Sequence, residues 1–178
     1  MRKLKLEELN RPDLQTFRNK EKIPVIIILD NVRSAMNVGS VFRTADAFAC
    51  EKIILGGITA TPPNREITKT AIGATDSVIW EYSPEISEKI AVLKSDGYKI
   101  YGIEQTDQSV MLDQQLPEHD KAVLIFGNEV DGISDSVMDL LDGCIEIPQF
   151  GTKHSLNVAV CAGIVLWEFS KYHRRCRK

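Results

Sequence analysis

The chain has 178 residues, of which 43% are hydrophobic and 26% charged, so one globular domain with a substantial core is expected. No apolar run approaches the roughly 18 residues that a membrane span needs, and the polar N-terminus lacks the apolar segment of a secretory signal. The four cysteines and three histidines are scattered, which disfavours a disulfide framework or a metal cluster and favours a reducing cytoplasm.

Charge is unevenly distributed along the chain. Residues 1–22 carry seven lysines and arginines against four acids, and residues 171–178 carry five with no acid, although the net charge is −3. We therefore divide the chain into a basic N-terminal extension (1–22), one domain (23–170) and a basic C-terminal tail (171–178). Basic ends on an acidic body suggest arms that contact a polyanion, and a tail kept basic for solubility is the alternative.

The first half of the domain shows strands and helices in alternation. Residues 25–29 form a continuous apolar run that is typical of a strand buried on both faces. A helix is expected over 38–48 and a second strand over 52–55. The long connection 59–77 has helical potential only around 67–72 and leads to a third strand over 77–81.

The second half continues this alternation. The expected elements are a helix over 84–93, strands over 99–104 and 122–126, a helix from the N-cap Ser134 to Leu141, a strand over 144–147 and a helix over 156–172. This order predicts a parallel α/β sheet with helices on both faces. In such sheets, ligands bind at the carboxyl ends of the strands.

Three polar loops that contain glycine lie at this edge of the predicted sheet. They cover residues 30–45, 126–134 and 147–158. Neither GxGxxG after the first strand nor GxxxxGK[ST] occurs, so a dinucleotide-binding dehydrogenase and a P-loop NTPase are disfavoured. Glycines in all three loops would let backbone amides approach a ligand closely.

Each loop also has a purely structural interpretation. Asn37 could cap the helix that follows it, and Ser155 could cap the last helix. Arg43 could form an ion pair with Asp46 or Glu129. These interpretations leave three polar loops at one edge of the sheet unexplained, so we favour a ligand site.

Together, the three loops resemble the three sequence motifs of the SpoU family, within the SPOUT superfamily of knotted methyltransferases. Order and spacing agree over residues 24–170, which is most of the chain. The first motif is matched by Asn37, Gly39, Arg43, Thr44 and Ala45, the second by Gly127, Asn128, Glu129 and Gly132, and the third by Ile147, Pro148, Gly151, Ser155, Leu156, Asn157 and Val158.

The resemblance implies a fold and an activity. The C-terminal segment of the α/β sheet would thread a trefoil knot, and a homodimer would complete the active site across its interface. The activity would be transfer of a methyl group from S-adenosylmethionine to a ribose 2′-hydroxyl of RNA. We favour tRNA as the substrate because the basic arms are short. The alternatives are an rRNA methyltransferase, an enzyme that acts on a base nitrogen, and a catalytically silent RNA-binding protein of the same fold.

The resemblance also implies roles for individual residues. The guanidinium of Arg43 is a poor base because its pKa lies above about 12, so we expect it to grip the target phosphate, with that phosphate or Ser155 relaying the proton. The catalytic set would be Arg43, Asn37, Glu129, Ser155 and Asn157. The cofactor would be held by Gly102, Ile103, Glu104, Phe126, Gly127, Asn128, Gly132, Ile147, Pro148, Ser155, Leu156 and Asn157. RNA would be contacted by Arg33, Arg43, Lys171, Arg174, Arg175, Arg177 and Lys178.

Overall fold

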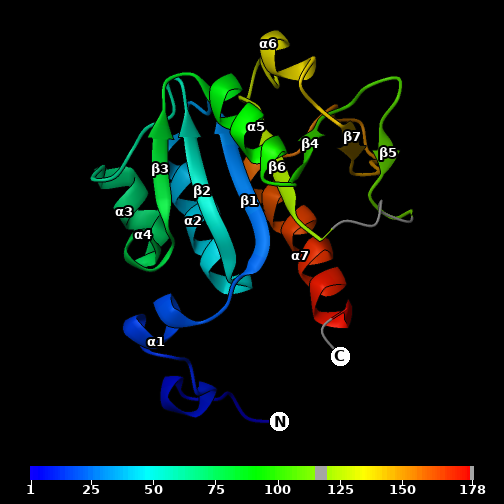
Figure 1. Cartoon of the computed structure of the whole chain (residues 1–178). Helices are drawn as coiled ribbons and strands as arrows, with labels where there is room; N and C mark the ends of the chain where they lie inside the picture. The colour runs from blue at the N-terminus through cyan, green and yellow to red at the C-terminus, as the bar shows by residue number, and fades with distance from the viewer. Residues whose placement is uncertain (115–119, 177–178) are drawn as a thin grey trace.

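Seven strands form one sheet in the computed structural model of the protein, which describes residues 1–114 and 120–176 (Figure 1). The strand order is β3-β2-β1-β6-β4-β7-β5, and every neighbouring pair is parallel. The predicted parallel α/β sheet is therefore confirmed. The bounds are β1 Ile23–Asp30, β2 Cys50–Gly56, β3 Trp80–Ser83, β4 Lys99–Ile103, β5 Val110–Met111, β6 Ala122–Phe126 and β7 Gly143–Glu146.

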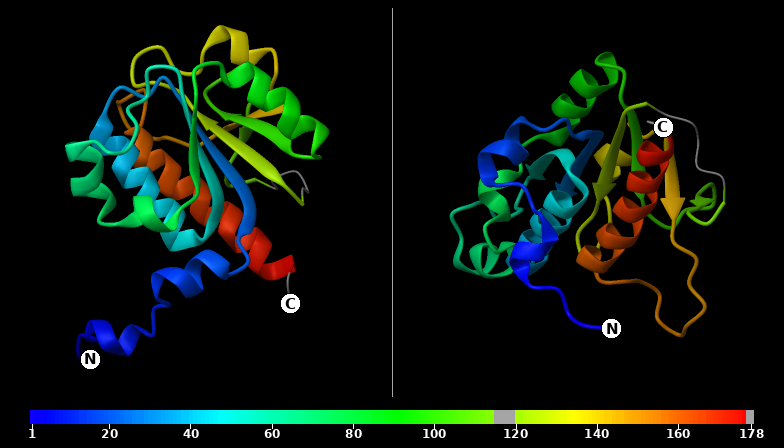
Figure 2. Two further views of the ribbon diagram at one scale, coloured as in Figure 1. Left: turned by 60° about the vertical axis from the view of Figure 1, so that its left-hand side comes forward. Right: turned by 90° about the horizontal axis from the view of Figure 1, so that it is seen from below.

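Helices cover both faces of this sheet (Figure 2). Apart from a short 3-10 helix at Leu6–Leu9, they are α1 Leu14–Asn19, α2 Ala35–Phe48, α3 Arg65–Ala71, α4 Ala74–Ser77, α5 Ile86–Ser95, α6 Asp135–Met138 and α7 Val158–Cys176. Residues of α2, α3, α4 and α7 belong to the core on one face, and residues of α5 and α6 belong to the core on the other. Within residues 1–114 and 120–176, the helices are too short or too polar to cross a membrane.

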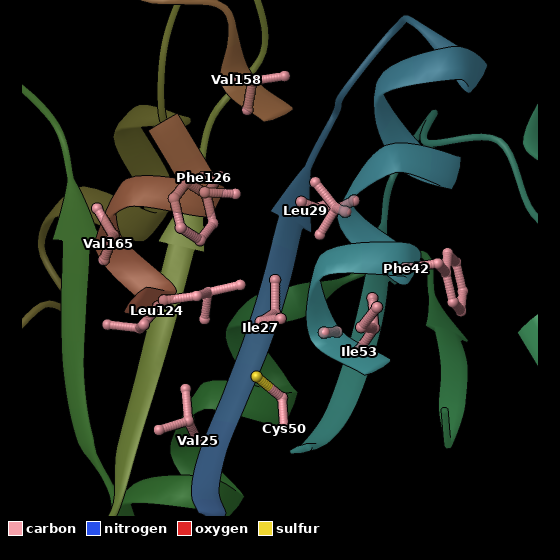
Figure 3. Packing of buried hydrophobic residues seen from close by; sticks show 14 of the residues in the cluster. Val25, Ile27, Leu29, Phe42, Cys50, Ile53, Leu124, Phe126, Val158 and Val165 are labelled. Atoms are coloured by element: carbon pink, nitrogen blue, oxygen red, sulfur yellow. The ribbon is translucent and has the colours of Figure 1, made fainter. Parts of the chain in front are cut away.

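Strand β1 explains why the central apolar run is continuous. Val25, Ile27 and Leu29 pack into the core shared with α2 and α7, as Figure 3 shows. Ile26 and Ile28 face the opposite core under α5 and α6. Because successive side chains of a strand point to opposite faces, a strand covered on both sides needs apolar residues at every position.

The ends of two helices differ from the sequence interpretation. Helix α2 begins at Ala35, three residues earlier than expected, because the Ser34 hydroxyl accepts a hydrogen bond from the backbone N–H of Asn37 (3.3 Å). Asn37 therefore lies inside the first turn and does not cap the helix. Asn157, not Ser155, caps α7, because its side-chain oxygen accepts the N–H groups of Ala159 (2.9 Å) and Val160 (3.4 Å).

Some elements were placed wrongly or missed. Strand β3 covers 80–83 instead of 77–81, since residues 74–77 form the short helix α4. Helix α6 ends at Met138 instead of Leu141, and β5 was not expected. Helix α7 continues four residues beyond the expected end, so that residues 171–176 of the basic tail are helical.

The N-terminal extension lies beyond the amino end of β1 (Figure 1). Its helix α1 is capped by Asp13, which accepts the backbone N–H of Thr16 over 2.7 Å. The guanidinium of Arg18 donates through Nε to the carbonyl oxygen of Asp76 over 2.8 Å. This contact attaches the extension to α4, away from the carboxyl edge of the sheet.

Candidate active site

A pocket of about 390 Å³ opens at the carboxyl edge of the sheet. It lies between the ends of β4, β6 and β7 and the segment that leads into α7. Ten of the twelve residues predicted to hold the cofactor line it, so the structure brings β4 together with segments of the second and third motifs. These ten are Ile103, Glu104, Phe126, Gly127, Asn128, Gly132, Ile147, Ser155, Leu156 and Asn157.

Two of the predicted residues do not line this pocket. Gly102 is buried, and a Cβ there would come within 3.0 Å of the Leu141 side chain, so this glycine serves packing against the segment that follows α6. Pro148 is also absent from the lining. The sequence interpretation missed other lining residues, among them Gln105, Ile145, Glu146, Gln149, His154 and Cys161. Only their position in the sequence could have identified them, because each lies in or beside a strand end or a motif segment.

The second motif forms a tight turn against the pocket. The backbones of Asn128 and Gly132 exchange two hydrogen bonds, of 3.0 and 3.2 Å, and the Asn128 side-chain oxygen accepts the N–H groups of Val130 and Asp131 (both 2.8 Å). A Cβ at Gly127 would lie well inside 3.0 Å of backbone atoms of Gly132 and Ile133. Only glycine fits at position 127 without moving the turn.

Glu104 ties this turn to the end of β4. Its carboxylate accepts the backbone N–H of Gln105 (3.0 Å) through one oxygen and that of Ile133 (3.2 Å) through the other. Because both oxygens hold main-chain donors, the carboxylate has a fixed place in the pocket wall.

Glu129, Asn37 and Asn157 form a hydrogen-bonded cluster that joins all three motif segments. The Glu129 carboxylate accepts the backbone N–H groups of Arg33 (3.0 Å) and Ser34 (3.2 Å) and the side-chain amide of Asn37 (2.9 Å). The amide nitrogen of Asn157 donates to the side-chain oxygen of Asn37 over 3.1 Å. Both ends of the Asn37 amide are thereby engaged.

This cluster keeps Glu129 ionised. Partial desolvation works to raise the pKa of Glu129, but hydrogen bonds from the backbone of Arg33, the Asn37 amide and the backbone of Ser34 outweigh it. The pKa therefore lies below its ordinary value. A carboxylate of lowered pKa is a weak base, so the arrangement suits Glu129 to orienting the amides.

Cys161 belongs to the apolar wall of the pocket. Burial, followed by the nearby carboxylate of Glu104, raises the pKa of its thiol to about 12. The thiolate is the nucleophilic form of cysteine, and it is almost unpopulated at neutral pH with such a pKa. The wall at this point is chemically inert.

Arg43 is not brought to the pocket within one chain. It follows Asn37 by six residues, about 9 Å along the axis of α2, and its side chain is exposed. It lines a separate hollow with Arg11, Asp46 and residues of α4. The interpretation of Arg43 as part of an ion pair with Asp46 or Glu129 is wrong, because it forms no ion pair with any residue that the structure describes.

Gly39 of the first motif serves helix packing. It lies inside α2, where a Cβ would come within 3.0 Å of the Thr70 hydroxyl and the carbonyl oxygen of Ile67 in α3. The hydroxyl of Thr70 donates to the carbonyl oxygen of Met36 over 3.1 Å. The expectation that this glycine lets backbone approach a ligand is wrong, because α3 occupies the space beside it.

Apart from Arg43, the residues predicted to contact RNA lie at two places. Arg33 stands beside the pocket, with its side chain 3.5 Å from the Asp131 carboxylate. On α7, the Lys171 ammonium pairs with Glu168 at 2.8 Å, and the Arg174 guanidinium lies 5.0 Å from the centre of the Trp167 ring. The side chain of Arg175, and Arg177 and Lys178 altogether, fall outside the described residues.

Known proteins share this sequence pattern. Residues 24–167 match the model of a family described as the SpoU rRNA Methylase family. The chain is 33% identical over 152 residues to a 23S rRNA (guanosine-2′-O-)-methyltransferase of Neisseria meningitidis serogroup B, a match that covers 85% of this chain and 60% of that protein. It is 30% identical over 167 residues to a tRNA (guanosine(18)-2′-O)-methyltransferase of Mus musculus, covering 92% and 10%. The chain thus spans less than two thirds of both relatives.

Solved structures share the fold. The crystal structure of a TrmH/SpoU tRNA modifying enzyme from A. aeolicus is similar with a TM-score of 0.81 and 25% identity, over 92% of this chain and 83% of that one. An AdoMet-bound rRNA methyltransferase from Sinorhizobium meliloti is similar with a TM-score of 0.78 and 26% identity, over 88% and 60%.

Proposed function

The chain belongs to the SpoU rRNA Methylase family, and from this premise we propose that it transfers a methyl group from S-adenosylmethionine to a ribose 2′-hydroxyl of RNA. The observation that carries the proposal is the cluster of Glu129, Asn37 and Asn157. Glu129 and Asn157 also line the pocket, so the cluster places polar groups from all three motifs beside a ligand-sized cavity.

The pocket fits S-adenosylmethionine in size and in chemistry. Its volume of about 390 Å³ lies in the range of small-molecule sites. The side chains of Ile103, Ile147 and Leu156 offer apolar walls for the adenine ring, and the turn at Gly127 allows close backbone approach. The carboxylates of Glu104, Glu129 and Glu146 give a negative lining that suits a ligand with a sulfonium and an ammonium group. These residues and the other predicted ones that line the pocket would hold the cofactor.

The residues of the chain chiefly orient the two reactants. When bound, the cofactor supplies an activated methyl group for in-line displacement by the ribose oxygen. In this proposal, Glu129 and Asn37 are positioning residues that hold Asn157 in place. The proton of the ribose hydroxyl is relayed by the target phosphate or by the hydroxyl of Ser155, which lines the pocket and passes the proton on. Arg43 grips that phosphate through a bidentate contact.

We further propose a homodimer that supplies Arg43 across its interface. Helix α7 leaves Val160, Ile164 and Trp167 between 38% and 52% exposed, at spacings of four and three residues. They form an apolar stripe next to α2, where the Phe48 ring lies 5.9 Å from that of Trp167. A second copy seated on this stripe would bury it and bring its own α2, with Arg43, towards the pocket.

The trefoil knot is part of the same proposal. Strand β7 lies on the far side of β6 and β4 from β1, whereas α7 packs against α2 and β1. Residues 147–157 must therefore cross the carboxyl ends of β4 and β6. Passage of this segment through the loop formed by residues 126–134 would tie the knot and would enclose the cofactor between the two.

The substrate and the cellular site are proposed more broadly. We propose tRNA as the substrate, contacted by Arg33, Arg43 and the basic residues of 171–178, with rRNA as the alternative. A silent RNA-binding protein of the same fold is the rival from outside the enzymes, and the intact cluster and pocket argue against it. We place the protein in the cytoplasm because its described cysteines, Cys50, Cys144 and Cys161, are free.

One experiment tests the proposed function. Labelled S-adenosylmethionine is incubated with the protein and unmodified total tRNA or, separately, rRNA, and the product is digested to nucleosides. We expect a 2′-O-methylated nucleoside from tRNA. The same product from rRNA alone would support the alternative substrate, and a base-methylated product would contradict the ribose chemistry. Cofactor binding without transfer to either RNA, or no cofactor binding at all, would contradict the proposed activity.

A further inference from the structure

Phe150 is almost fully exposed beside the pocket. Its side chain is 96% exposed, whereas the other exposed aromatic side chains of the described residues, Tyr82 and Trp167, reach 47%. A partner that covers the face of an exposed aromatic ring removes apolar surface from water, which lowers the free energy. The reaction proposed above gives this ring no role.

The position of Phe150 ties it to the site. Gln149 and His154 both line the pocket, and the four residues between them do not line it. All residues from 150 to 156 are exposed. The segment then continues into Ser155 and Asn157, so Phe150 stands close in sequence to two residues of the proposed active site.

Basic and polar residues follow Phe150 closely in the chain. Lys153 and His154 follow within four residues, and Lys153 forms no ion pair with any part of the chain that the structure describes. Arg33 stands beside the pocket from the first motif. An aromatic ring among cations is the combination by which proteins hold single-stranded nucleic acid, with the ring stacked on a base and the cations at phosphates.

We propose that Phe150 stacks on a nucleobase of the RNA strand at the site and that Lys153 contacts a phosphate of the same strand. The inference rests on the proposed function and adds a positioning residue to it. A second copy of the chain is a poorer partner for this ring, because Gln149, Gly151 and Thr152 around it are polar or lack a side chain. The apolar stripe on α7 offers such a copy a continuous surface instead.

The test compares three substitutions in the full chain. Phe150→Tyr keeps the aromatic face, Phe150→Leu keeps only apolar volume, and Lys153→Gln removes the charge. RNA affinity is measured with unmodified total tRNA over a salt series, together with KM, kcat, cofactor affinity and the oligomeric state. Phe150→Leu should weaken RNA binding or raise KM by about 5- to 150-fold, with cofactor affinity and the salt slope unchanged. Phe150→Tyr should stay within about threefold, and Lys153→Gln should lower the salt slope by about one.

Some outcomes would overturn the stacking role. Wild-type RNA binding by Phe150→Leu would do so, and so would an equal loss of cofactor affinity or a change in oligomeric state, which would make Phe150 a structural or dimer residue.

A Phe150→Trp variant tests the stacking role separately from the methyl-transfer activity. Quenching of its fluorescence by RNA, beyond that of the wild type with Trp80 and Trp167, supports stacking even if no methyl is transferred. Methyl transfer without that quenching would leave the activity standing and refute the stacking.

Discussion

Asn37 and Asn157 stand 120 residues apart in the chain, and the Nδ2 group of Asn157 donates a hydrogen bond to Oδ1 of Asn37 over 3.1 Å. The other end of the Asn37 amide donates to Glu129 over 2.9 Å. An ionised carboxylate only accepts hydrogen bonds, so Glu129 sets the orientation of Asn37, and Asn37 in turn sets that of Asn157. A change at Glu129 should therefore reach the far end of the cluster.

Replacing Glu129 by Gln tests this dependence. A glutamine amide must turn its NH2 group towards at least one of the three donors that Glu129 accepts, so the cluster loses an acceptor either for Arg33 or for Ser34 and Asn37, and the orientation of Asn37 is no longer held by all of these contacts. We expect kcat for methyl transfer to fall about 100-fold, the scale of a small misplacement of reacting groups. The matched control is Glu88→Gln on the exposed side of α5, which should leave kcat unchanged. Equal rates for both variants would refute the positioning role.

The stability difference between the wild type and Glu129→Gln should depend on pH. Because the pKa of Glu129 is lowered in the folded protein, its ionised form stabilises the fold fully above the ordinary value of roughly 4.3. That contribution is lost as the pH falls through the lowered pKa. The difference in unfolding free energy between wild type and Glu129→Gln should thus be constant at neutral pH and shrink below about pH 4. Urea denaturation at several pH values measures it, and a difference that grew towards acid would contradict the prediction.

Gly127→Ala should disrupt the pocket. The added methyl group meets backbone atoms of Gly132 and Ile133, which cannot move aside as a flexible side chain can. We expect a loss of about 1–3 kcal/mol in unfolding free energy and at least tenfold weaker cofactor binding by calorimetry. Gly151→Ala is the control, since a Cβ there meets nothing within 4 Å. If both variants bound the cofactor equally well, the close approach at Gly127 would have no role in binding.

Gly39→Ala should destabilise the protein without reaching the cofactor. Alanine is the better helix former by about 1 kcal/mol, but the methyl group would collide with the backbone of Ile67 and separate α3 from α2. We expect a net loss of about 1–3 kcal/mol in thermal or urea unfolding, with unchanged cofactor affinity of the folded protein. Gly163→Ala in α7, with open space around it, should stabilise instead by about 0.5–1 kcal/mol. Weaker cofactor binding by Gly39→Ala would contradict the prediction and would indicate a role for this glycine in the cofactor site.

Arg43 can be assigned to its own subunit or to the partner by complementation. Arg43→Ala and Glu129→Gln should each lose most methyl transfer. If Arg43 acts across the dimer, a mixed dimer of the two variants contains one site with both residues intact. Random mixing should then restore about a quarter of the wild-type rate, because half of the dimers are mixed and each has one working site. No recovery in verified mixed dimers would place Arg43 in the site of its own chain.

A separate variant, Arg43→Lys, tests the bidentate contact between Arg43 and the target phosphate. We expect it to lose most activity, and near wild-type turnover would refute the bidentate contact.

The fold could be predicted where burial dominates the sequence. Strand β6 has the expected bounds because all five of its residues are buried and apolar. The bounds predicted for β3 are wrong because only Ser83 of its four residues is buried, so the sequence pattern of this strand at the edge of the sheet indicates little. The two residues of β5 are too short a run for any periodicity.

The site could be predicted only in part. Motif spacing singled out Asn37, Glu129 and Asn157, and the fold brings them into hydrogen-bond contact. Spacing could not show that Asn157, instead of Ser155, caps α7, because both choices suit a helix start. Nor could it show that Arg43 stays outside the pocket of its own chain, since that depends on the direction in which α2 presents each residue.

The central place of β6 in the sheet has a consequence during synthesis on the ribosome. Strands β1, β2 and β3 can pair once Ser83 has been made, but the other edge of β1 waits for Ala122–Phe126. At about 5–20 residues per second, the intervening stretch takes roughly 2 to 8 seconds to translate. Throughout that interval the most apolar strand of the nascent chain offers an open edge to other chains. Slow translation between β3 and β6 should therefore favour aggregation of this protein more than slow translation after β6.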